Sequence, residues 1–67
     1  MKGIIPQVIS TLERIQEVNQ MLAFHRTFAE PDENAIENFQ DLRNDFMQQL
    51  AELMKAFELE VRWKDAA

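Results

Sequence analysis

Acidic side chains one helical turn apart are the groups in this sequence that could most readily do chemistry. Four such pairs occur, namely Glu13/Glu17, Glu33/Glu37, Glu37/Asp41 and Asp41/Asp45. Residues four apart share one face of a helix, so each pair could hold a metal ion. The sequence lacks the Glu-x-x-His motif that completes di-metal sites in helical bundles. We therefore expect solvated helix faces, with no metal ion and no other cofactor.

Nucleophiles and bases for catalysis are also scarce. The sequence has no cysteine and no glycine-rich phosphate loop, and its single serine, Ser10, lies outside any nucleophile-elbow motif. The one histidine, His25, could titrate against Asp32 or Glu33. No second ligand or nucleophile lies beside it, so we interpret His25 as a surface residue. We expect a protein that is not an enzyme and has no catalytic residues.

Length and charge restrict the class of protein further. Sixty-seven residues form one domain at most, and a core of that size barely offsets the conformational entropy lost on folding. Without cysteines, self-association is the remaining means of stabilisation. A net charge of −5 disfavours a globally basic nucleic-acid binder. The basic residues that such a binder would have to use are Arg14, Arg43, Arg62 and Lys64.

Apolar runs in the chain are short. Near the N-terminus only Ile4 and Ile5 precede Pro6, too few for the apolar core of a signal peptide. No span approaches the length of a membrane helix. We expect a soluble, cytoplasmic protein that does not associate with membranes.

The second half of the chain carries the strongest structural signal, an apolar repeat at three- and four-residue steps that predicts an amphipathic helix over about residues 32–63. At about 100° per residue the apolar side chains cover an arc of about 140°, too wide for contact with one neighbouring helix. Glu58–Arg62 and Glu60–Lys64 would add ion pairs along it. The repeat consists of Ile36, Phe39, Leu42, Phe46, Met47, Leu50, Leu53, Met54, Phe57 and Val61.

The first half predicts a helix over about residues 5–26, with an apolar face that covers about half of its circumference. The connection over residues 27–34 is short and makes the two helices antiparallel neighbours. We expect Pro31 to open the second helix; Asp32 as a cap, or a Thr27/Glu30 capping box, are alternatives. The apolar face of the first helix consists of Ile5, Val8, Ile9, Leu12, Ile15, Val18 and Leu22.

Both apolar faces are broader than one partner helix can cover, so the hairpin needs another surface against it. We predict an all-α fold in which residues 1–67 form a single antiparallel two-helix hairpin. Two hairpins would dimerise into a four-helix bundle, the commonest closed solution being an isologous homodimer.

Polar residues interrupt both apolar faces. Folding the hairpin brings Asn19 near Gln40 and Arg43 near Gln16, which predicts a polar layer that fixes the register of the bundle. Alternatively, Arg43 holds an acidic ligand, or its guanidinium reaches solvent or a carboxylate such as that of Glu17 or Asp45.

Three further apolar residues lie on the side of the first helix opposite its main face: Met21, Phe24 and Phe28. They could fold over the turn as a cap on the bundle, or bind a partner. Leu59 and Trp63 likewise lie off the main face of the second helix. Trp63 would pack on the N-terminal segment or serve as an interface anchor.

Taken together, these patterns predict a small non-enzymatic protein-interaction or regulatory module that acts as a homodimer. Its candidate partner-binding residues are Met21, Phe24, Phe28 and Trp63. The first alternative is a subunit, chaperone or anti-adaptor of a hetero-oligomeric complex, in which a different protein covers the apolar faces. The second alternative is a nucleic-acid-binding regulator.

Overall fold

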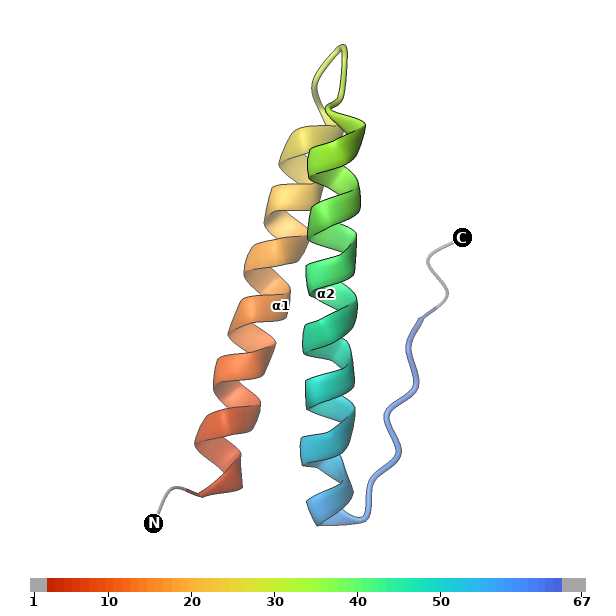
Figure 1. The fold of residues 1–67 in the computed structure, drawn as a ribbon. Helices are drawn as coiled ribbons and strands as arrows, with labels where there is room; N and C mark the ends of the chain where they lie inside the picture. Colours follow the sequence, from red (N-terminus) through yellow and green to blue (C-terminus); the bar gives the residue numbers. More distant parts are fainter. Residues whose placement is uncertain (1–2, 65–67) are drawn as a thin grey trace.

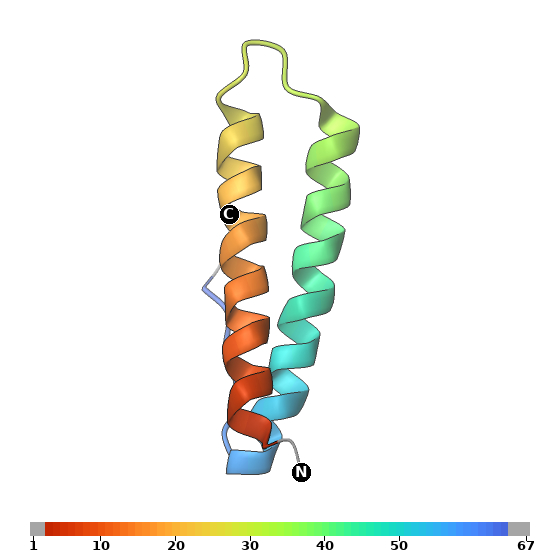
Figure 2. The same cartoon turned by 90° about the vertical axis from the view of Figure 1, so that its left-hand side faces the viewer.

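Two antiparallel helices account for most of the chain. The structure, a computed structural model, describes residues 3–64. Helix α1 spans Ile4–Arg26 and helix α2 spans Glu33–Met54, and the two pack side by side along their length (Figures 1 and 2). A 3₁₀ turn, η1, follows at Lys55–Phe57. The predicted all-α hairpin is therefore confirmed, and residues 3–64 contain no strand.

Local side-chain chemistry defines the turn between the helices. The Thr27 hydroxyl donates to the Phe24 carbonyl oxygen (2.6 Å) at the end of α1. Asp32 caps α2, because its carboxylate accepts hydrogen bonds from the backbone N–H groups of Asn34 (3.0 Å) and Ala35 (3.2 Å). The alternative with Asp32 as the cap is thus correct, and the prediction that Pro31 opens the helix is wrong. Asp32 satisfies two of the N–H groups that a helix start leaves free.

The end of α2 differs from the prediction of a helix to about residue 63. Glu58 adopts a left-handed conformation, with φ 57° and ψ 34°. The N–H of Leu59 then donates to the Met54 carbonyl oxygen (3.3 Å), and the N–H of Glu58 donates to that of Lys55 (3.0 Å). This pair of bonds is the Schellman motif, which ends a helix by satisfying its last carbonyl groups. Glycine usually occupies the left-handed position, so a glutamate there gave no signal in the sequence.

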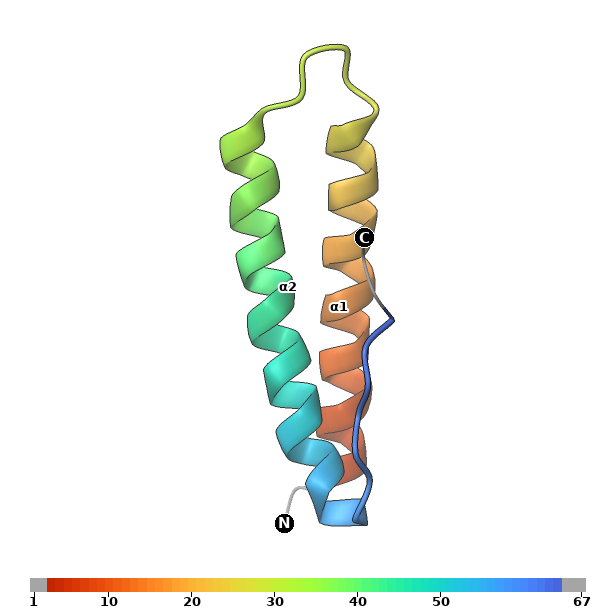
Figure 3. The same ribbon diagram turned by 90° about the vertical axis from the view of Figure 1, so that its right-hand side faces the viewer.

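Beyond Glu58 the chain is extended. Residues 58–64 run back from the end of α2 toward the middle of the hairpin (Figures 1 and 3). The predicted i,i+4 ion pairs Glu58–Arg62 and Glu60–Lys64 are therefore wrong, since this segment is not helical. Instead the Arg62 Nε atom lies 3.6 Å from a carboxylate oxygen of Glu60, and both side chains are exposed.

The core between the helices is thin. Its buried hydrophobic side chains are Val18, Leu22, Met47 and Leu50. Thr11 is also buried, and its hydroxyl donates to the Gln7 carbonyl oxygen (2.8 Å), which removes the cost of burying a free hydroxyl. The predicted apolar faces are thus only partly covered within one hairpin.

Neither helix of the described part of the chain combines the length and hydropathy needed to cross a membrane.

Candidate interaction surfaces

Aromatic side chains gather at the turn end of the hairpin, where α1 ends and α2 begins. The rings of Phe24 and Phe28 meet edge to face, with centroids 5.0 Å apart. His25 meets both rings in the same manner, at 5.8 Å from Phe24 and 5.5 Å from Phe28. Its ring also lies 5.4 Å from that of Phe39 on α2. The cluster therefore joins the two helices beside the turn.

His25 differs from its sequence interpretation. It is half-buried rather than a surface residue, and its Nδ1 atom is buried with no hydrogen-bond partner. The rings around it belong to Phe24, Phe28 and Phe39. The sequence could not show this, because Phe39 reaches His25 only when the hairpin closes.

Helical spacing places further apolar side chains on the same side of the hairpin as this cluster, and we call this side the aromatic face. Phe24 is 56% exposed, Phe28 42% and Leu42 41%. Met21 is also exposed, while Phe39 and Phe46 are half-buried. The sequence did not indicate that α2 contributes to this face, because Phe39, Leu42 and Phe46 belong to a repeat that we expected to face the core. The signal that could have shown it was the width of that repeat, which is too large for one neighbouring helix. The aromatic face consists of Met21, Phe24, Phe28, Phe39, Leu42 and Phe46.

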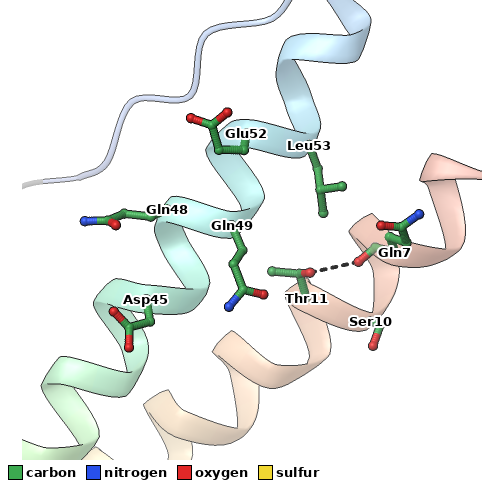
Figure 4. Close-up of a pocket in the computed structure, with 8 residues that line it drawn as sticks. All are labelled: Gln7, Ser10, Thr11, Asp45, Gln48, Gln49, Glu52 and Leu53. Carbon is green, nitrogen blue, oxygen red and sulfur yellow. Dashed lines mark hydrogen bonds between the residues drawn. The ribbon is translucent and has the colours of Figure 1, made fainter.

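Below the aromatic face, toward the open end where α1 begins and α2 ends, a shallow polar groove lies between the helices (Figure 4). Its lining contains carboxylates and carboxamides but no histidine. Ser10 lines this groove together with the carboxylates of Asp45 and Glu52. We call it the glutamine groove; its lining is Gln7, Ser10, Thr11, Asp45, Gln48, Gln49, Glu52 and Leu53.

The predicted polar layer is brought together only in part. Asn19, Gln40 and Arg43 line one groove with Arg26 and Asn44, which we call the arginine groove. Gln16 does not line it, and within one hairpin Gln16, Asn19 and Gln40 are exposed.

Arg43 is the least exposed member of the predicted polar layer. Its Nε atom is buried and finds no hydrogen-bond partner among the described residues. A carboxylate oxygen of Glu17, one of the expected partners of Arg43, lies 3.7 Å from a guanidinium nitrogen of Arg14 instead. A role of Arg43 in fixing the register of a bundle stays a prediction.

A second exposed apolar surface lies at the open end. It consists of Ile5, Ile9 and Leu12 on α1, and we call it the aliphatic patch. These residues belong to the predicted face of the first helix, but α2 covers only the part of that face that includes Val18 and Leu22. The sequence signal was the width of the face, which exceeds what one neighbour covers.

Trp63 lies in the extended segment after α2 and is 44% exposed. Leu59 in the same segment is also exposed. The prediction that both residues lie on a helix is therefore wrong, and the partner role of Trp63 stays a prediction.

Acidic residues give no metal centre in the part of the chain that the structure describes. No group of three potential ligands among His, Cys, Asp and Glu is found within residues 3–64. Ion pairs such as Lys55–Glu52 (2.9 Å) are exposed and contribute little to stability.

Comparison with known proteins adds no further constraint: no protein-family model matches the chain, and neither curated proteins nor solved structures give a significant match.

Proposed function

We propose that this protein is a small non-enzymatic protein-interaction module that acts as a homodimer, with two hairpins forming a four-helix bundle. The observation that carries this proposal is the imbalance between buried and exposed apolar side chains. Within residues 3–64, four hydrophobic side chains are buried, whereas eleven large hydrophobic side chains are exposed. Such a surface on a small protein marks a place where another surface binds.

Energetics favour a second copy as that other surface. Full burial of one large hydrophobic side chain contributes about 1.5–3 kcal/mol. The core of a hairpin of this length is too small to give a single copy more than marginal stability. A homodimer supplies the missing burial from the same sequence, and an isologous contact closes the assembly because each copy covers the same surface of the other.

The polar surfaces support binding rather than catalysis. Ser10 lines the glutamine groove, which contains carboxylates and carboxamides but no histidine. His25 lies at the other end of the hairpin among aromatic rings. A nucleophile and a base within hydrogen-bond reach are the minimum for covalent catalysis, and Ser10 and His25, at different ends of the hairpin, do not form such a pair.

One observation favours a second candidate function, participation in a hetero-oligomeric complex. The aliphatic patch of Ile5, Ile9 and Leu12 is exposed and lies away from the aromatic face. A dimer that buries the aromatic face leaves this patch free, and a different protein could bind there. Nucleic-acid binding has less support, because Arg14 is paired with Glu17 and Arg62 with Glu60.

Light scattering on the purified protein over a dilution series tests the proposal. The expected result is a monodisperse species of twice the 7.9 kDa chain mass, which dissociates on dilution. A monomer that unfolds cooperatively at all concentrations would contradict it, as would a mass that grows well beyond the dimer. A poorly folded, polydisperse sample would favour the hetero-oligomeric complex instead.

A further inference from the structure

The two sides of the hairpin differ in a way that constrains how a second copy could bind. Met21 and Ser10 are about three helical turns apart on α1, and therefore point in nearly the same direction. Leu42 and Leu53 have the same spacing on α2. Met21 and Leu42 belong to the aromatic face, whereas Ser10 and Leu53 line the glutamine groove. The aromatic face and the glutamine groove thus follow one another along a single side of the hairpin.

The opposite side carries the remaining two surfaces. Leu12 and Met21 are separated by about 180° around α1, so the aliphatic patch faces away from the aromatic face. Asn19 lies about two turns from Leu12 and lines the arginine groove. On this side the exposed apolar patch comes from α1. On the side that carries the aromatic face, which we call the aromatic side, both helices contribute the exposed apolar residues.

We propose that the second copy binds the aromatic side, with the two interhelical turns at the same end of the dimer. In this arrangement a two-fold axis runs along the hairpin, and α1 of each copy packs against α2 of its partner. The inference rests on the proposed homodimer and specifies which surface forms it.

Apolar matching selects this orientation. With the turns at the same end, Met21 on α1 lies opposite Leu42 on the partner's α2. The two-fold axis creates the same contact a second time, between Leu42 of the first copy and Met21 of the partner. With the turns at opposite ends, the aromatic face would lie on the partner's glutamine groove. Asp45 and Glu52 in that groove would then lose water against aromatic rings without gaining a partner, which is costly.

The carboxylates at the start of α2 do not oppose the arrangement, whereas Asp45 and Glu52 lie on the interface side and would face the polar side chains of the partner's glutamine groove. Around α2, Glu33 lies about 180° from Leu42 and Glu37 about 140° from it. These carboxylates therefore point away from the aromatic side and do not face their copies across the proposed interface.

The size of the interface is also compatible with a stable dimer. A standard interface buries about 800 Å² per partner, which is about one seventh of the 5635 Å² accessible surface of the hairpin. One side of a hairpin that is 46 Å long offers a contact of that order.

Distances between spin labels test the orientation directly, because the chain has no native cysteine. A single label at Ala29→Cys reports on the turn end and, in a separate sample, one at Lys55→Cys reports on the open end. We predict that in each sample the two labels of the dimer lie much closer together than 46 Å, which is the length of the folded hairpin. Distances near that length at both positions would show turns at opposite ends and overturn the inference.

Light scattering on the labelled samples separates two kinds of failure. A dimer with long label distances contradicts only the orientation. A monomer without dipolar coupling contradicts the homodimer itself, and with it this inference.

A matched pair of variants tests the choice of side. Phe24 and Ile9 are exposed to nearly the same extent, 56% and 54%, on the aromatic face and the aliphatic patch. Phe24→Asp should raise the dimer dissociation constant by about tenfold or more, as expected when a charge replaces an aromatic side chain in the interface. Ile9→Asp should change it by less than about twofold. Equal effects, or a larger effect of Ile9→Asp, would overturn the assignment.

Discussion

The turn end and the open end of the hairpin both expose apolar side chains, yet they are built differently. At the turn end, residues from both helices meet, as His25 of α1 and Phe39 of α2 show. At the open end, the exposed residues Ile5 and Ile9 come from α1, while α2 ends in a left-handed residue, Glu58. At the turn end, Asp32 also caps the start of α2 by accepting two backbone hydrogen bonds.

This difference indicates that exposure alone does not identify an interface in a small helical protein. A surface to which both helices contribute can meet its own copy in a two-fold arrangement, with one helix type against the other. A patch that lies on one helix has no matching patch on the other helix to contact in such a dimer. We therefore expect a different protein to bind it. Four sets of variants test this difference between the two ends.

The largest effect is expected in the core that joins the two ends. Leu50→Asp should abolish folding, because an unpaired buried carboxylate costs about as much as the 3–5 kcal/mol that a core of this size supplies. Circular dichroism would show loss of helicity. Leu12→Asp in the aliphatic patch is the matched control and should stay folded, with a change below about 1 kcal/mol. Full helicity with Leu50→Asp would refute the assignment of the core.

At the turn end, Asp32→Ala removes the cap of α2. The expected loss is about 1 kcal/mol of unfolding free energy, because two backbone N–H groups lose their acceptor. The melting temperature should fall by about 4–8 °C. Asp32→Ser retains an acceptor and should recover most of the loss; an equal loss in both variants would mean that the cap does not stabilise this end.

At the open end, Glu58→Gly should stabilise the protein by about 0.5–1 kcal/mol, because glycine adopts the left-handed conformation without steric cost. Glu60→Gly, in the extended segment, is the control and should give no gain. Urea titration measures both. A destabilised Glu58→Gly variant would indicate that the glutamate side chain itself contributes to the end of α2.

The smallest effect is expected for Arg43 in the arginine groove. Its Nε atom is buried without a partner, so Arg43→Met should leave stability unchanged or raise it by up to about 0.5 kcal/mol. Arg26→Met in the same groove is the control for loss of an exposed charge. A loss above about 1 kcal/mol for Arg43→Met alone would mean that the guanidinium gains a partner in the assembly.

Sequence periodicity was sufficient for the two helices and their antiparallel order, because the apolar repeats and the short connection determine both. It failed at Glu58, since a Schellman motif without glycine leaves no compositional mark. It also divided the aromatic face, because the contact between His25 and Phe39 joins residues that are distant in the chain. Which part of a broad apolar face is covered depends on the tilt and rotation of the packed helices, which periodicity does not specify.

Thermal unfolding followed by circular dichroism over a wide concentration range tests whether a second copy completes the fold. If folding and association are coupled, the melting temperature must rise with protein concentration. We predict that rise for the native chain, and a clearly smaller rise for Phe24→Asp. A cooperative transition at the same temperature at every concentration would contradict the claim.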